Sequence, residues 1–318
     1  MSGITGIHHI TAIAGDAQEN LDFYTGVLGM RLVKRSVNQD VTNTYHLFYA
    51  DRDAHPGTDL TFFPWPDLPA RKDGIGIGAE IGLAIPAGTV EFWATRLERF
   101  GIAHPTIESR RGSKTLVFDD PHGLKLSLAE ITESREFTPW NDGPVAADNQ
   151  IRGLHMVRLW EREVEPTASF LTGVLGFKSI GAESNWHRFA LGDGESGKYL
   201  EVCEIPGSSR GTWGVGAMHH VAWRVPDDDS QLEVRERVSA AKRRPTEVID
   251  RFWFKSVYFM EPGGVLFEVA TDGPGFTVDE DLESLGESLV LPPWLERDRA
   301  SIEASLPRLD TKSRDRVT

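Results

Sequence analysis

Cysteine is nearly absent from this chain of 318 residues, and basic residues are fewer than acidic ones. Because Cys203 is the single cysteine, an intramolecular disulfide and a zinc site built on cysteine pairs are both excluded. Its surroundings, YLEVCEI, predict a small buried residue of a strand. The balance of 34 lysines and arginines against 48 acidic residues gives a net charge of −14, which disfavours nucleic acid and anionic membranes as partners.

Long hydrophobic runs are also missing. No apolar segment approaches the roughly 20 residues that a membrane-spanning helix needs. The first residues lack the basic region and apolar core of a signal peptide, and together with the single cysteine this predicts a cytoplasmic protein. The composition, 40% hydrophobic and 26% charged, is that of a globular chain with a substantial core. We therefore expect a small substrate or another protein as its partner.

Two double histidines are the most conspicuous motif. The stretch GIHHITAIAGD occupies residues 6–16, and AMHHVAWRVPDD occupies residues 217–228. In both, adjacent histidines stand at the head of a strand-like apolar run. Histidine is the commonest metal ligand in proteins and the usual proton carrier near neutral pH, so both pairs are candidates for a metal or catalytic site.

A fourfold repeat underlies these pairs. Each module combines a short alternating strand, a helix and three further strands. FYTGVLGMR at 23–31 returns as FLTGVLGFK at 170–178, and the turn DPHG at 120–123 matches EPGG at 261–264. A single βαβββ module leaves one face of its sheet uncovered, whereas two paired modules form a cupped eight-stranded sheet. The repeat therefore predicts an α+β fold of four modules and two such sheets.

A polar segment that contains proline and glycine divides the repeats into two halves. The expected units are a two-module domain at 1–131, a linker at 132–150, a second two-module domain at 151–273, and a C-terminal strap and helix at 274–318. We also expect Asp16 as a helix N-cap, and helices near 229–243 and 294–305.

Superposing the modules shows which histidines share one structural position. The first-strand position is held by His9, Glu80, Met156 and His220, and the last-strand position by residues near Thr61, Ser127, Glu201 and Glu268. The spacing supports this register, since 48 residues separate His220 from Glu268 and 47 separate Glu80 from Ser127. His9, His220 and Glu268 thus form a set of two imidazoles and one carboxylate, the facial triad that leaves positions open on Fe(II).

This alignment has a consequence for the architecture. The first and fourth modules supply the whole triad, so these two should pair around the metal and the second and third should pair with each other. The second and third modules carry no histidine at the ligand position, which favours a degenerate structural site there. His8 and His219 neighbour the proposed ligands and are either structural or part of the surroundings of the site. His155 aligns with His8 and is not expected to be a ligand.

The motifs together resemble one known family. They include the opening 6–40, the segment TYHLFYADRDAHPGTDLTFFPW at 44–65, HHVAWRV, EPGGVLFEVATDGPGF and the LPPWLE tail, and they cover nearly the whole chain. The sequence resembles ring-cleaving (extradiol-type) dioxygenases of the vicinal oxygen chelate superfamily, and within it the hydroquinone dioxygenase branch. The resemblance implies the vicinal oxygen chelate fold and a non-haem Fe²⁺ enzyme, with Mn²⁺ as the alternative metal. Its substrates would be O₂ and a substituted hydroquinone or catechol-like aromatic.

The resemblance also implies roles for individual residues. The metal ligands would be His9, His220 and Glu268, and the residues of the substrate pocket would be His8, Thr11, His219, Arg251 and Tyr258. Tyr258 or one of the neighbouring histidines would handle a phenolic proton, and Arg251 would offset negative charge. The alternatives for these two residues are a strand core tyrosine and a surface charge.

Two rival functions remain open at this stage. One is a glyoxalase-like, metal-dependent isomerase or lyase, and the other is a non-catalytic protein that binds small molecules on the same scaffold. A triad of two histidines and one glutamate disfavours the first, and the length of four modules disfavours the second. The expected partners are a small aromatic substrate and O₂, with no nucleic acid and no membrane, and a homo-oligomer is left open.

Overall fold

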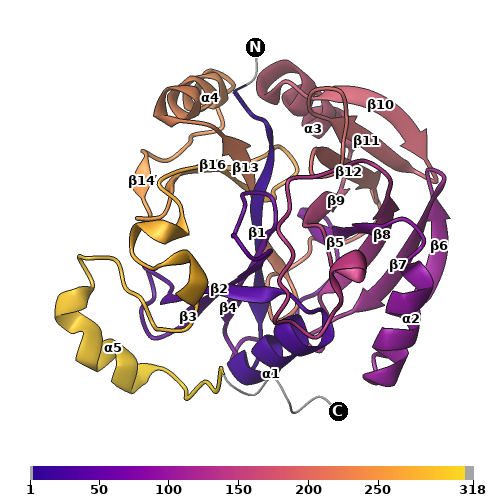
Figure 1. Cartoon of the computed structure of the whole chain (residues 1–318). Coiled ribbons are helices and arrows are strands. Elements are labelled where there is room, and N and C mark those ends of the chain that lie inside the picture. The colour runs from indigo at the N-terminus through magenta and orange to yellow at the C-terminus, as the bar shows by residue number, and fades with distance from the viewer. Residues whose placement is uncertain (1–2, 312–318) are drawn as a thin grey trace.

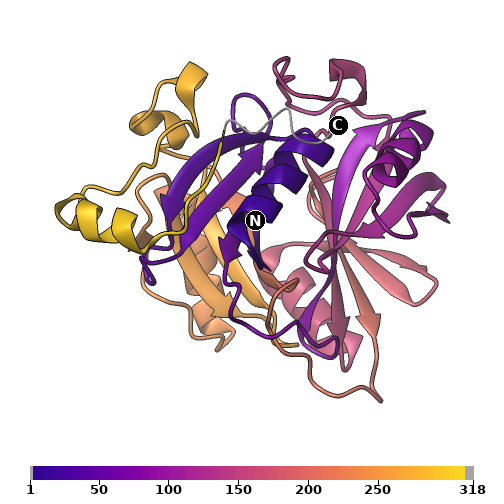
Figure 2. The ribbon, with the colours of Figure 1, turned by 90° about the horizontal axis from the view of Figure 1, so that it is seen from below.

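The computed structural model describes residues 3–311, which form two eight-stranded sheets. Figure 2 shows the indigo and orange strands of one sheet on one side of the molecule, and the purple and pink strands of the other sheet beside them. The predicted α+β architecture of paired modules, the vicinal oxygen chelate fold, is therefore confirmed.

The first sheet is built from the two ends of the repeat. Its strand order is β14-β15-β16-β13-β1-β4-β3-β2. The first module contributes β1 (Gly6–Ala14), β2 (Arg31–Val37), β3 (Tyr45–Ala50) and β4 (Asp59–Pro64), and the fourth contributes β13 (Met218–Val225), β14 (Ile249–Asp250), β15 (Lys255–Met260) and β16 (Leu266–Thr271). The predicted pairing of the first module with the fourth is confirmed.

The second sheet is built from the middle of the repeat, in the order β10-β11-β12-β9-β5-β8-β7-β6. Its strands are β5 (Ile77–Pro86), β6 (Thr106–Arg110), β7 (Ser113–Asp119), β8 (Lys125–Ile131), β9 (Leu154–Glu161), β10 (Lys178–Glu183), β11 (Trp186–Ala190) and β12 (Tyr199–Glu204). Each sheet thus takes strands from both halves of the sequence. The domain boundaries at 1–131 and 151–273 describe how the modules follow one another along the chain, and they stay a prediction.

Strand registers agree with the superposition of the modules. In every module the residue two places after the first-strand position pairs with the last-strand position. The four parallel pairs are Thr11 with Thr61, Gly82 with Ser127, Arg158 with Glu201, and Ala222 with Glu268. Because side chains alternate along a strand, residues two apart share a face, and each pair therefore marks the same inward-facing site.

Helices lie around the two sheets, and the last of them belongs to the C-terminal strap at one side of the molecule (Figure 1). They are α1 (Ala17–Leu21), α2 (Val90–Arg99), α3 (Val164–Phe170), α4 (Asp228–Ala240) and α5 (Arg299–Ser305), with π-helical turns at Asp22–Val27 and Leu171–Leu175. Asp16 caps α1 as predicted, accepting hydrogen bonds from the backbone N–H groups of Gln18 and Glu19 at 2.8 and 2.9 Å.

Two helix boundaries differ from the expected ones. Helix α4 ends at Ala240 rather than 243, because Lys242 adopts a left-handed conformation with φ of 60°. Helix α5 begins at Arg299 rather than 294, since the residues after Pro292 form separate tight turns, with Leu295 N–H donating to Pro292 O at 2.9 Å.

Two further features complete the fold. Cys203 lies on β12 as expected, but it is half-buried, because alternation sends Leu200 and Val202 into the core and Cys203 to the other face. The C-terminal strap, yellow in Figure 1, runs along β2, where Leu289 forms a bridge with Arg35. Within residues 3–311 we find no helix with the length and apolar character needed to cross a membrane.

Candidate metal centre

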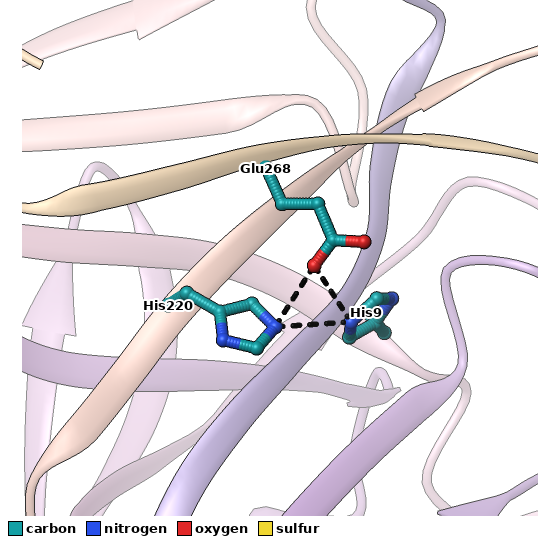
Figure 3. Close-up of side chains that lie close together, drawn as sticks. All are labelled: His9, His220 and Glu268. Carbon is teal, nitrogen blue, oxygen red and sulfur yellow. Dashed lines mark hydrogen bonds and ion pairs between the residues drawn. The ribbon is translucent and has the colours of Figure 1, made fainter. Parts of the chain in front are cut away.

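Three side chains from three strands meet inside the first sheet. His9 comes from β1, His220 from β13 and Glu268 from β16, and all three are buried. Their donor atoms converge on one point (Figure 3): the two Nε2 atoms are 3.2 Å apart, and Oε2 of Glu268 lies 3.5 Å from Nε2 of His9 and 3.0 Å from Nε2 of His220. The predicted triad is therefore assembled in space.

Strand pairing explains the convergence. β1 and β13 are antiparallel neighbours at the centre of the sheet, and Thr11 stands directly opposite His220. His9 shares the face of Thr11, being two residues away, so both histidines point into the same cup. β16 pairs with β13 on its other side, which brings Glu268 to the same level.

The donor set fits a divalent cation. Oε1 of Glu268 accepts a hydrogen bond from Ser256 at 2.5 Å, whereas the buried Oε2 accepts none from any of residues 3–311. A buried carboxylate oxygen without a hydrogen bond is costly unless a cation occupies its free side. Among residues 3–311, this triad is the one group of histidines, cysteines or acidic residues whose ligand atoms lie close enough to hold a metal ion.

Each ligand histidine is held from behind by its sequence neighbour. Nδ1 of His9 is 2.8 Å from Nδ1 of His8, and Nδ1 of His220 is 2.8 Å from Nδ1 of His219. If Nε2 binds a metal, Nδ1 carries the proton and donates a hydrogen bond to Nδ1 of the neighbouring ring. Such a second hydrogen bond fixes the tautomer and orientation of a metal-bound imidazole.

Electrostatics favour the protonation states that metal binding needs. Burial opposes ionisation of Glu268, yet the two histidines outweigh it and hold the pKa of this carboxyl well below its usual range. Burial lowers the pKa of His220, against the opposing effect of Glu268. Near neutral pH the site therefore offers an anionic carboxylate and a neutral His220 imidazole, which are the states that bind metal.

A cavity of about 360 Å³ opens beside the triad. Its walls are largely aromatic and apolar: Phe48, Phe63, Trp65, Trp253, Phe254 and Leu266. The polar lining includes His46, His219, Arg251 and Tyr258, with His9 and His220 at the triad. A concave, mostly apolar site with a few polar groups is typical of a small-molecule pocket, and aromatic walls suit a planar ring.

The predicted pocket residues take different places. Tyr258 lies on β15 opposite Glu268, with its ring centroid 5.7 Å from that of His220, and both burial and Glu268 raise its pKa. Cζ of Arg251 lies 5.6 Å from the centroid of the Tyr258 ring. His219 lines the cavity and stacks on Trp213, with ring centroids 4.6 Å apart.

His8 and Thr11 lie behind the cavity rather than on its wall. The His8 ring is buried and packs against Phe254, with centroids 5.2 Å apart. Oγ1 of Thr11 lies 3.0 Å from Nε2 of His220 and 2.8 Å from Oγ1 of Thr61. Thr61 occupies the position that Glu268 has in the fourth module, so this site carries a hydroxyl where a fourth carboxylate could have stood.

The sequence interpretation missed two titratable residues of the cavity, His46 and Asp40. His46 lies on β3, where its ring packs on Phe48 and its Nε2 is 3.0 Å from Oγ1 of Thr61. The alternation in YHLFYA was the available signal, because Leu47 and Tyr49 enter the core and His46 must face the cup. Asp40 lies on the loop after β2 and pairs with Arg251, and no local pattern marks that contact.

The equivalent site of the second sheet is filled by arginines. Glu80 accepts hydrogen bonds from Ser127 and Arg110, each at 2.6 Å. Glu201 accepts from Arg158 and Arg188 at 2.7 Å and from Arg111 at 3.1 Å. The guanidinium groups supply positive charge to these carboxylates, as a metal would supply it to Glu268, which agrees with a structural role. His155 forms a 2.9 Å contact with Ser196 and is not among the candidate ligands within residues 3–311.

Comparison with known proteins places this architecture in a family. The profile of the Glyoxalase/Bleomycin resistance protein/Dioxygenase superfamily matches residues 6–128 and again 153–269. The chain is 41% identical over 313 residues to the "Putative ring-cleaving dioxygenase MhqO" of Bacillus subtilis (strain 168), covering 98% of both proteins. It is 33% identical over 301 residues to the "Chlorohydroquinone/hydroquinone 1,2-dioxygenase" of Sphingobium indicum, covering 92% of this chain and 93% of that protein.

Solved structures agree. A crystal structure described as a "putative dioxygenase" from Bacillus subtilis superposes with a TM-score of 0.91 at 38% identity, covering 98% of this chain and 99% of that one. Glyoxalase I from Zea mays shares the fold alone, with a TM-score of 0.62 at 16% identity over 84% of this chain and 92% of that one. The chain therefore belongs to the Glyoxalase/Bleomycin resistance protein/Dioxygenase superfamily, in the branch that holds these ring-cleaving dioxygenases.

Proposed function

We propose that this protein is an Fe²⁺-dependent dioxygenase that opens the ring of substituted hydroquinones, or of catechol-like aromatics, and incorporates both atoms of O₂. The observation that carries the proposal is a buried donor set of two Nε2 atoms and one carboxylate oxygen that converge beside an aromatic-walled cavity. The names of two relatives, a ring-cleaving dioxygenase and a hydroquinone dioxygenase, support the reaction class and the substrate class.

His9, His220 and Glu268 would hold the metal. Three donors leave open coordination positions, so a bound Fe²⁺ would bring a substrate hydroxyl and O₂ together and lower the pKa of that hydroxyl. Two imidazoles and a carboxylate also accept Mn²⁺, which is the alternative metal. The scaffold positions the three ligands before the metal arrives, because each stands on a strand at the centre of the first sheet.

The remaining residues would bind and orient the aromatic ring. Phe48, Phe63 and Trp253 provide apolar walls that exclude water and hold a planar substrate beside the triad. Tyr258 is placed to exchange a proton with a ring hydroxyl, since it lies on the strand next to that of Glu268 and lines the cavity. Arg251, next to the Tyr258 ring, would offset negative charge on the substrate oxygens.

The two neighbouring histidines would differ in role. His8 is buried behind His9 and outside the cavity lining, so its task would be to orient that ligand. His219 both contacts His220 and lines the cavity, so it could also contact the substrate. The Thr11 hydroxyl, 3.0 Å from Nε2 of His220, would lie beside a metal bound at that atom.

The glyoxalase-like alternative is less well supported. That chemistry on this scaffold usually uses more carboxylate or amide ligands, whereas the fourth position here is the hydroxyl of Thr61. A non-catalytic binding protein would not need a buried carboxylate oxygen that lacks a hydrogen bond. We also propose a cytoplasmic location, supported by the single cysteine.

Oxygen uptake tests the proposal directly. The protein is loaded with Fe²⁺ under anaerobic conditions and then mixed with oxygenated buffer and hydroquinone, methylhydroquinone, chlorohydroquinone or catechol. We expect stoichiometric O₂ consumption with at least one ring, and ¹⁸O₂ should place two labelled atoms in the ring-opened product. If the iron-loaded protein consumes no O₂ with any of these rings, the proposed function is wrong.

A further inference from the structure

We propose that Asp40 determines substrate specificity by masking the charge of Arg251 at the mouth of the cavity. The pocket would then prefer rings with neutral substituents over rings that carry a carboxylate. The inference rests on the proposed function only for its choice of dihydroxybenzene ligands. Asp40 belongs to the loop between β2 and β3, and Arg251 to the loop between β14 and β15, so the pair joins the first and fourth modules.

The contact between these residues is bidentate. Nη2 of Arg251 donates to Oδ2 of Asp40 at 2.9 Å, and Nη1 donates to Oδ1 at 3.3 Å. Both side chains line the cavity, and Arg251 is the one lysine or arginine among the lining residues that the structure describes. A carboxylate on a bound ring would seek this guanidinium, and Asp40 already uses both of its terminal nitrogens.

The loop that carries Asp40 is built to keep it there. Oδ1 of Asn38 accepts hydrogen bonds from the backbone N–H groups of Asp40 and Val41, both at 2.9 Å, which forms an Asx turn. Nε2 of Gln39 donates to the backbone carbonyl of Arg251 at 2.9 Å. The loop is thus fixed to the backbone of Arg251 independently of the ion pair, so the carboxylate remains at the cavity mouth when Arg251 moves slightly.

The Arg251 side of the pair is also constrained. Phe252 follows it with φ of 76°, a left-handed conformation that is unfavourable for an aromatic residue, and its N–H donates to Oδ1 of Asp250 at 2.7 Å. The next residue, Trp253, donates from its indole N–H to Asp279 at 3.0 Å. The backbone on this side is thus fixed, and the guanidinium lies between Asp40 and the Tyr258 ring, where it can face a ring oxygen but would have to give up Asp40 to pair with a ring carboxylate through both terminal nitrogens.

The two carboxylates would therefore compete. A ring carboxylate must either displace Asp40 or sit near it as a like charge, whereas a hydroxyl, methyl or halogen substituent meets neither obstacle. The side chain of Asp40 is 71% exposed and that of Arg251 only 17%, so water and salt weaken the masking without abolishing it. An effect of about fivefold is the scale expected for one such partly exposed pair.

The test compares two ligands that differ by one carboxylate, hydroquinone and 2,5-dihydroxybenzoate, in Asp40→Asn and wild-type protein. Anaerobic binding to the Fe²⁺-loaded protein is followed by indole fluorescence, because Trp65 and Trp253 line the cavity. We expect Asp40→Asn to improve the Kd for 2,5-dihydroxybenzoate relative to hydroquinone about fivefold at low salt, and less at 0.5 M NaCl. Where turnover occurs, the ratio of kcat/KM values should shift in the same direction.

The matched control is Glu247→Gln, which removes one exposed carboxylate from a surface pair with Arg235 outside the cavity lining. It should leave the Kd ratio unchanged, which separates local masking from a change in net charge. An unchanged ratio in Asp40→Asn would overturn the inference, as would an equal shift in the control. Because binding is measured without turnover, a protein that binds both rings but consumes no O₂ would refute the proposed function and still decide this inference.

Discussion

Ser256 donates a hydrogen bond of 2.5 Å to Oε1 of Glu268, so the two oxygens of that carboxylate have different surroundings. Oε1 is engaged by the hydroxyl, and Oε2 is left facing the Nε2 atoms of the two histidines. Ser256 lies on β15 and is fully buried, so the hydroxyl holds the carboxylate in one orientation before any metal binds.

Removing this hydroxyl should weaken metal binding. Ser256→Ala frees the carboxylate to rotate and leaves Oε1 without its partner, and we expect Fe²⁺ affinity to fall about 10-fold. The measurement is anaerobic competition with a coloured Fe²⁺ chelator. The matched control is Ser36→Ala, since Ser36 is equally buried but its hydroxyl has no hydrogen bond within the described part of the chain. Equal affinities in the two variants would contradict the assigned role.

Removing one of the three proposed ligands should prevent the protein from binding a full equivalent of iron. His9→Ala deletes one of three donors and leaves the other two, which hold a labile divalent ion poorly. Metal analysis after gel filtration should find little iron in His9→Ala and a full equivalent in His155→Ala. His155 is a suitable control because it is also buried and lies outside the triad. Full iron content and activity in His9→Ala would exclude the triad as the metal site.

His155 also provides a test of pH-dependent stability. Burial, together with Arg188 and Arg135, lowers the pKa of this imidazole to about 3 from 6.5. The folded state therefore keeps the ring neutral while the unfolded state takes up a proton below pH 6.5, so stability falls as the pH decreases from 6.5 toward 3. In urea titrations between pH 6.5 and 5, His155→Gln should flatten the slope by about 1 kcal/mol per pH unit.

Measurements at higher pH serve as the control for this experiment. Between pH 7.5 and 8.5 the imidazole is neutral in both states, so the two proteins should show the same dependence of unfolding free energy on pH. A slope below pH 6.5 that is identical in wild type and variant would mean that His155 does not contribute.

A buried carboxyl pair between the two sheets should limit stability at higher pH. Glu161, at the end of β9, faces Glu261 after β15, and both side chains are buried. Burial first, and then Glu261, raise the pKa of Glu161 to about 9. Glu261 has its own partners, accepting from Thr167 Oγ1 and from the N–H of Val265 at 2.8 Å.

The substitution Glu161→Gln should therefore stabilise the protein. Near pH 7 the unfolded state ionises this carboxyl and the folded state does not, so the folded state is at a disadvantage that grows from pH 4.5 to 9. We expect Glu161→Gln to raise the free energy of unfolding by about 2 kcal/mol at pH 7 and by less at pH 5. Glu247→Gln, at an exposed site, serves as the comparison. A loss of stability at pH 8 would show that the carboxylate form is favoured.

Much of the fold and of the metal site could be predicted from the sequence. The period-two alternation of strands and the internal repeat are local patterns, and superposing the modules was enough to select His9, His220 and Glu268. The same alignment predicted that the first and fourth modules pair, which the strand order confirms. Arg251 and Tyr258 came from a family resemblance, and both line the cavity.

Such local patterns could not predict contacts between segments that lie far apart in the sequence. Asp40 meets Arg251, and Glu161 meets Glu261, because different modules pack together, and nothing in the local sequence around either partner marks the other. Local sequence patterns also could not predict that His8 and His219 lie in different surroundings. Both follow one motif, yet His8 packs under Phe254 while His219 borders the cavity, because the loops that cover the two strands differ.

The sequence by itself determined the repeated module, the positions of the candidate metal ligands and the absence of a site built on cysteine pairs. These depend on residue type and on spacing along one strand or one module. Only the tertiary structure decided how the donor atoms converge, which oxygen of Glu268 is left for a metal, and which charges meet at the mouth of the cavity. The first and last of these features depend on the packing of the first module against the fourth, which brings together residues such as His9 and His220, 211 positions apart. The second depends on the contact between Ser256 and Glu268 on neighbouring strands of the fourth module.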